Sequence, residues 1–173
     1  MDEMMDKSLT VSEALRFANH DFLNQLHLIQ MYLDLQHVDE AKQLIQQIAE
    51  QSKMLSNVNK LGLPKTIEWL QTVSWRYPTW QVTLSSNVQQ VANELLDSHI
   101  VQYLENTVIH LEEALNPYTE QALSILVECH AGSFFIKVHF SGQWEAAQFN
   151  KETKLTAQVL EETNNSWHFI LSE

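Results

Sequence analysis

Residues 14–35, ALRFANHDFLNQLHLIQMYLDL, have the apolar spacing of one long helix, and this segment constrains the fold more than any other. At about 100° per residue, a set of side chains falls in one narrow stripe typical of a helix face that becomes covered. This apolar seam consists of Leu15, Ala18, Phe22, Leu26, Ile29 and Leu33. His20 lies roughly 155° from the centre of the seam, so we expect its side chain to face solvent or a partner.

A second helical pattern follows within a few residues. Thr10 or Ser12 is expected to cap the first helix, after a charged tail over residues 1–9, and Asp39 is expected to cap the second. The second pattern covers residues 40–61 and ends at Gly62, with Pro64 just beyond. Because short connections place helices antiparallel, residues 1–62 are predicted to form a helical hairpin domain.

A single two-helix hairpin cannot bury its own apolar surface. We therefore expect a homodimer in which two hairpins form a four-helix bundle, with His20 on each outer surface. The alternative is that the hairpin packs against the C-terminal half of its own chain.

Residues 63–173 are predicted to form an α+β domain with a mostly antiparallel sheet and two helices on one face. The helices are expected at residues 66–76 and 98–115, and a first strand at residues 80–85. Two hairpins should follow, separated by a loop over residues 142–152, with their strands at residues 122–129, 134–140, 154–162 and 166–172.

Composition excludes several function classes. The net charge of −12 would repel nucleic acid and anionic lipid, and no apolar run reaches the ~18 residues of a membrane span. The start of the sequence, MDEMMDKS, does not resemble a secretory leader, and the single cysteine, Cys129, excludes an internal disulfide. We expect a cytoplasmic protein. The 3 glycines are too few for a glycine-rich phosphate loop, so no nucleotide is expected.

The first helix carries a recognisable histidine motif. Residues 19–35, NHDFLNQLHLIQMYLDL, followed by EAKQLIQQI, resemble the histidine box of the sporulation initiation phosphotransferase B family and of related sensor histidine kinases. The resemblance continues more weakly through LQTVSWRYPTWQVTLSSN and FFIKVHFSGQW into the last hairpin, so it covers nearly the whole chain. It implies a dimeric four-helix bundle followed by a degenerate histidine-kinase ATPase domain.

The resemblance also implies that the nucleotide site has been lost. In such kinases an asparagine-bearing helix and glycine-rich boxes hold magnesium and nucleotide. Here the matching helix, YLENTVIHLEEAL, offers only Asn106 with His110 downstream, and the glycine boxes are reduced to Gly142.

By the same resemblance, the chain is a phosphorelay phosphotransferase, as in the initiation of sporulation. His20 would accept a phosphoryl group from the aspartate of one response-regulator receiver domain and pass it to another. Asp21 would orient or deprotonate the ring, and Asn24 would form a hydrogen bond. Neutral imidazole is nucleophilic near neutral pH, which suits this role. No metal site or cofactor is expected in this chain, and the regulator would supply Mg²⁺.

Neighbouring residues and other functions were also weighed. Arg16, Leu23, His27 and Met31 are predicted to contact the regulator, although Arg16 and His27 could equally be solvated side chains. A metal held by the polar residues around His20 is disfavoured, because only one pair has near-ligand spacing. The alternatives are an ATP-dependent sensor-type histidine kinase and a non-enzymatic dimer that binds response regulators, with His20 vestigial.

Overall fold

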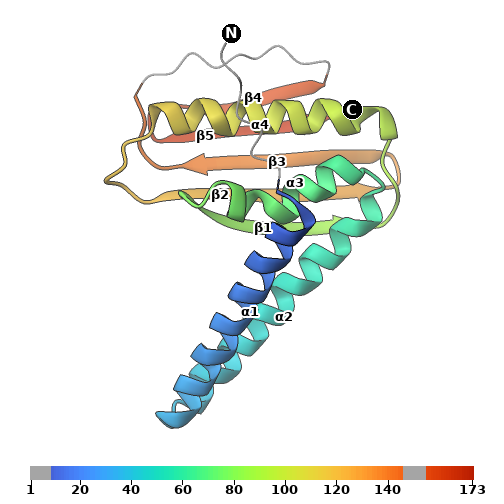
Figure 1. The fold of residues 1–173 in the computed structure, drawn as a ribbon. Helices are drawn as coiled ribbons and strands as arrows, with labels where there is room; N and C mark the ends of the chain where they lie inside the picture. Colours follow the sequence, from blue (N-terminus) through green and yellow to red (C-terminus); the bar gives the residue numbers. More distant parts are fainter. Residues whose placement is uncertain (1–8, 146–154) are drawn as a thin grey trace.

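The computed structural model describes residues 9–145 and 155–173, and it has the predicted α+β architecture. Figure 1 shows that the N-terminal helical hairpin projects as an arm from a body in which helices cover one face of a sheet. Almost all of the predicted tail lies outside the described residues. Most of the predicted loop over residues 142–152 also lies outside them. The elements are α1 (Val11–Asp34), α2 (Val38–Val58), η1 (Asn59–Leu61), α3 (Pro64–Arg76), β1 (Trp80–Val88), η2 (Glu94–Leu96), α4 (Asp97–Ala114), β2 (Gln121–His130), β3 (Ser133–Ser141), β4 (Thr156–Glu162) and β5 (Ser166–Ser172).

The start of α1 is fixed by a reciprocal capping box. The Thr10 hydroxyl accepts the backbone N–H of Glu13, and the Glu13 carboxylate accepts the backbone N–H of Thr10 at 2.9 Å. The backbone hydrogen bond from Thr10 lowers the pKa of Glu13, so the carboxylate stays charged at the positive end of the helix. Thr10, rather than Ser12, is therefore the cap.

The connection between α1 and α2 is tighter than predicted. Gln36 adopts a left-handed conformation with φ of 63°, and the His37 N–H reaches back to the Tyr32 carbonyl at 2.8 Å. This is the hydrogen bonding of a Schellman motif, which reverses the chain at once. The predicted cap at Asp39 is wrong, because α2 already begins at Val38 and Asp39 lies in its first turn.

The apolar seam of α1 is exposed in the single chain. Leu15, Phe22 and Leu33 are 59%, 58% and 51% exposed, and α1 has no buried residue. The hairpin does contact the C-terminal half of its own chain near the start of α1, where the Phe17 ring stacks on Trp75 at 6.0 Å. That contact leaves the seam uncovered.

The sheet has the strand order β1-β2-β3-β5-β4. The pairs β2–β3, β3–β5 and β4–β5 are antiparallel, which confirms both predicted hairpins. The pair β1–β2 is parallel, and α4 forms the crossover between the two strands, as parallel pairing requires. Helices α3 and α4 lie over the same face of the sheet (Figure 1), as predicted.

Strand β1 is longer than predicted. Its last residues, Ser86, Asn87 and Val88, are mostly polar and give little sequence signal, yet they continue the pairing with β2 as far as Cys129. Asn57 of α2 holds this end, because its side chain accepts the Val88 N–H at 2.7 Å and donates to the Val88 carbonyl at 3.2 Å. A side chain outside the sheet therefore fixes where the strand ends.

The core lies between the sheet and helices α3 and α4. The predicted inward face of α4 is buried in full: Ile100, Tyr103, Leu104, Thr107, Val108 and Leu111. Val58 and Leu61 at the end of the hairpin belong to the same core, so the arm is anchored in the body. The domain boundary at residue 62 stays a prediction. Within the described ranges, no helix has the length and apolarity needed to cross a membrane.

We predict that Gly62→Ala destabilises the protein more than Gly132→Ala. Both glycines have positive φ, 73° and 79°, so either substitution introduces backbone strain of about 1 kcal/mol. A Cβ at Gly62 would also meet the Val91 side chain, whereas a Cβ at Gly132 meets nothing within 4 Å. The free energies of unfolding of the two variants, measured by urea denaturation, should differ by about 1 kcal/mol or more. Equal losses would contradict the steric assignment.

Candidate functional site

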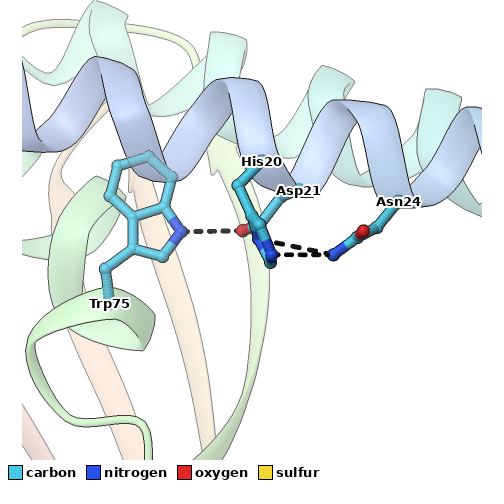
Figure 2. Close-up of polar contacts among 4 residues, drawn as sticks. All are labelled: His20, Asp21, Asn24 and Trp75. Atoms are coloured by element: carbon cyan, nitrogen blue, oxygen red, sulfur yellow. Dashed lines mark hydrogen bonds and ion pairs between the residues drawn. The ribbon is translucent and has the colours of Figure 1, made fainter.

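His20, Asp21 and Asn24 form an exposed polar cluster on α1 (Figure 2). The side chains of His20 and Asp21 are 68% and 50% exposed, with the imidazole facing away from the seam as predicted. His20 Nδ1 lies 3.2 Å from Asp21 Oδ1. The amide nitrogen of Asn24, one helical turn on, lies 3.3 Å from His20 Nδ1 and 3.4 Å from Nε2. The structure thus brings together the residues predicted to carry the chemistry.

These contacts favour one form of the neutral imidazole. A carboxylate can only accept hydrogen bonds, so the contact with Asp21 requires the proton on His20 Nδ1. The lone pair is then on Nε2, and the Asn24 amide can donate only to that nitrogen. At 3.4 Å this last hydrogen bond is long and therefore weak. Nε2 is left as an accessible nucleophile.

Trp75 of α3 is a further member of the site that the sequence analysis did not identify. Its indole N–H donates to Asp21 Oδ2 at 2.8 Å, as Figure 2 shows. Asp21 therefore lies between the imidazole on one oxygen and the indole on the other. One feature of the sequence could have identified Trp75: it lies outside the buried face of α3. That face is formed by Thr66, Trp69, Leu70 and Val73.

Helix α3 is fastened to α4 at both ends. At its start, the buried Asp97 carboxylate accepts the backbone N–H groups of Lys65 and Thr66 at 3.0 and 2.8 Å. These are helix N-terminal donors that would otherwise lack an intrahelical partner. Trp75 is consequently presented to α1 from a fixed helix.

Glu105 of α4 fastens the other end of α3. One carboxylate oxygen accepts the Trp69 indole N–H at 2.5 Å, and the other accepts from Arg76 at 2.5 Å and from the Tyr77 hydroxyl at 2.6 Å. Burial, together with the hydrogen bond to Glu105, raises the pKa of Tyr77, so the phenol stays protonated as a donor. The Arg76 and Glu105 side chains are only 10% and 16% exposed, which makes this a mostly desolvated ion pair.

The residues predicted to contact a partner are all exposed, and all lie on α1, the helix that carries the cluster. They are Arg16, Leu23, His27 and Met31, and Leu23 and Met31 are 53% and 45% exposed. The Arg16 guanidinium lies 5.5 Å from the centre of the Phe17 ring, within cation–π distance, so it is held close to the site. Exposed apolar and cationic groups beside a nucleophile form a surface suited to protein contact.

The α+β body offers little to a nucleotide among its described residues. Asn106 is exposed, but the adjacent Glu105 is already engaged by donors from α3. The backbone at Gly142 is approached by the carboxamide of the buried Gln121, which a Cβ at this position would strike. The missing side chain of Gly142 thus makes room for Gln121. Among residues 9–145 and 155–173, no group of three or more His, Cys, Asp or Glu side chains could hold a metal ion.

Comparisons with known proteins agree with the sequence resemblance over the arm. Residues 1–61 match the family model described as the alpha-helical domain of the SpoOB-type sensor kinase. The match confirms the predicted resemblance in this segment and supports a role in two-component signalling. No match was found among curated protein sequences.

Among solved structures, the Acinetobacter baumannii histidine kinase AdeS is similar at 13% sequence identity. The alignment covers 88% of this chain and 96% of that chain, with a TM-score of 0.39.

Proposed function

We propose that the protein is a cytoplasmic phosphorelay phosphotransferase that carries a phosphoryl group on His20 between the aspartates of two response-regulator receiver domains. The observation that carries this proposal is the exposed imidazole whose Nδ1 faces Asp21 while Nε2 is accessible. The family match over residues 1–61 supports it independently of that geometry. The same proposal includes the process that the phosphorelay serves, as in the initiation of sporulation.

The transfer step balances without any external proton donor. The Nε2 lone pair attacks the phosphorus of the donor's aspartyl phosphate, an N–P bond forms, and the P–O bond to the aspartate breaks to release a carboxylate. The imidazole keeps its Nδ1 proton and becomes positively charged, so the Asp21 carboxylate beside Nδ1 stabilises it. Attack by the carboxylate of the second regulator then reverses these changes and restores the neutral ring.

Asn24 and the partner complete the proposed site. The incoming phosphoryl group displaces the weak Asn24 contact from Nε2, and the same amide can then donate to a phosphoryl oxygen. Phosphoryl transfer depends on positioning and charge neutralisation, for which Mg²⁺ bound by the regulator is expected. Arg16, Leu23, His27 and Met31 are proposed to contact the regulator.

We further propose that the functional unit is a homodimer. The exposed seam continues into a groove of about 590 Å³ between α1, α2, α3 and β1, whose lining includes Leu15, Phe22 and Leu55. An apolar surface of this extent marks an interaction site. A second hairpin placed against the seam forms a four-helix bundle and leaves His20 on the outer face.

ATP is not expected to take part. Glu105, beside Asn106, is paired with Arg76 of α3, and the space at Gly142 is occupied by the Gln121 side chain. The body also carries more acidic than basic residues. A triphosphate would therefore meet net repulsion. This distinguishes the proposed phosphotransferase from an ATP-dependent histidine kinase.

We predict that His20→Ala folds normally but acquires no acid-labile phosphoryl group from a phosphorylated receiver domain. The substitution lies on an exposed helix surface, where alanine has high helix propensity, so no loss of stability is expected. His37→Ala, at another exposed histidine, is the matched control and should be labelled like the wild type. Labelling of the His20 variant would show that another residue is the acceptor. If the wild type binds the regulator without labelling, the protein is a non-enzymatic binding module.

We predict that Phe22→Glu converts the dimer to a monomer. An unpaired charge placed in a bundle core costs about 3–5 kcal/mol, enough to weaken association more than a hundredfold. Tyr118→Glu, at a residue 94% exposed outside the hairpin, controls for the added charge. Sedimentation should report a monomer for the first variant and a dimer for the second. A wild-type protein that is monomeric at micromolar concentration contradicts the four-helix model.

We predict that calorimetry with ATP and Mg²⁺ shows no saturable binding at millimolar nucleotide, because the groups that would hold the phosphates are engaged or absent from the described body. Titration with Mg²⁺ alone is the control. Transfer from a phosphorylated regulator to His20 should proceed with no nucleotide present. Saturable ATP binding together with ATP-driven labelling of His20 would place the protein among the kinases.

A further inference from the structure

We infer that Trp75 is a positioning residue for phosphoryl transfer at His20: its indole N–H fixes the Asp21 carboxylate that orients the imidazole. This inference rests on the proposed function for its catalytic consequence. The hydrogen bond between Trp75 and Asp21 is present in the free protein and does not depend on that function. Trp75 belongs to α3, so part of the α+β body completes a site whose other members lie on α1.

The geometry of Asp21 is the first step of the argument. An aspartate on an exposed helix surface ordinarily rotates about its side-chain torsions, and its broad terminal torsion leaves the carboxylate plane undefined. Here Oδ2 accepts the Trp75 N–H at 2.8 Å, while Oδ1 lies 3.2 Å from His20 Nδ1. The two contacts use different oxygens. The indole therefore selects the carboxylate orientation in which Oδ1 faces the imidazole.

The second step concerns Trp75 itself. An indole N–H is a donor only, so it cannot exchange roles with its partner as a hydroxyl can. The indole plane lies 16° from that of the Phe17 ring, with 6.0 Å between ring centres, and this stacking restricts its rotation. The donor is thus held by ring packing on one side and satisfied by Asp21 on the other.

The third step is the fixed position of α3. Asp97 holds its first turn and Glu105 holds its end, and both residues belong to α4. Trp75 immediately precedes Arg76, one of the donors to Glu105, so the indole projects from the turn of α3 that Glu105 fastens to α4. A displacement of α3 relative to α1 would be transmitted directly to Asp21.

The test compares Trp75→Phe with the wild type, because phenylalanine keeps an aromatic ring against Phe17 but has no N–H donor. Glu68→Gln, at an exposed residue of α3 outside the groove, is the matched control. Transfer from a phosphorylated receiver domain is measured as kcat and KM, and ¹⁵N NMR reports the His20 tautomer. Circular dichroism and urea denaturation confirm that each variant is folded.

We expect Trp75→Phe to lower kcat about tenfold, the effect of one charge-assisted hydrogen bond, with KM for the regulator unchanged within about twofold. The fraction of His20 protonated on Nδ1 should fall, since Asp21 is no longer held. Glu68→Gln should match the wild type in both measurements. A merely structural role for Trp75 would lower stability but would leave the tautomer unaltered.

The NMR measurement separates failure of this inference from failure of the proposed function. In Asp21→Asn the indole N–H resonance of Trp75 should shift, whether or not the protein transfers phosphate. If wild-type His20 takes no phosphoryl group, the proposed function fails, and the tautomer comparison still decides the role of Trp75. An unchanged tautomer in Trp75→Phe, or an unchanged indole resonance in Asp21→Asn, would overturn the inference.

Discussion

The attachment of α3 to α4 is the interaction on which the arrangement of the rest depends. The Glu105 carboxylate collects the donors of Trp69, Arg76 and Tyr77, while Asp97 satisfies the first backbone donors of α3. A largely buried carboxylate is costly unless its oxygens accept hydrogen bonds, and here donors from α3 and from its C-cap Tyr77 reach both oxygens. The result is a fixed helix that covers the sheet on one face and presents Trp75 to the arm on the other. The same interaction occupies the Glu105 carboxylate, which supports the proposal that the body takes no nucleotide. The Glu105 carboxylate thus links the packing of α3 on α4 to the position of Trp75, which contacts Asp21 beside His20.

The arm has the opposite character, because the described part of the chain leaves the apolar seam of α1 exposed. Leu15, Phe22 and Leu33 are all about half exposed, and isolated helices gain most of their stability in proteins from packing of such a face. The capping box at Thr10 and the Schellman turn at Gln36 define both ends of α1 without covering the seam between them. Local interactions therefore set the length of the helix. In the proposed homodimer, association would cover the seam and leave His20 on the free face of α1, so that one helix would serve both purposes.

Much of this structure could be predicted from the sequence, because periodicity depends on local geometry. The apolar spacing located α1, α2 and α4, and in α4 it identified the buried residues individually. Alternation and turn residues located both antiparallel hairpins. The failures came where a distant group decides a local outcome, as when Asn57 extends β1 to Val88. The parallel pairing of β1 with β2 likewise leaves no local signal. The motif that singled out His20, Asp21 and Asn24 lies on one helix, whereas Trp75 contacts Asp21 across 54 positions. Helix phase cannot report that contact.

The parallel pairing of β1 with β2 has a consequence for the order in which the molecule folds. Helices α1 and α2 and the two antiparallel hairpins join neighbouring segments, and such local contacts form early because little loop entropy opposes them. Strand β1 must wait for the whole of α4 and for β2, since its partner begins at Gln121. Helix α3, which lies between the arm and β1, gains its attachment to α4 only at that later stage. A nascent chain can therefore display His20 on a formed helix long before the indole reaches Asp21. On this order of events, the hydrogen bond between Trp75 and Asp21 forms late in folding.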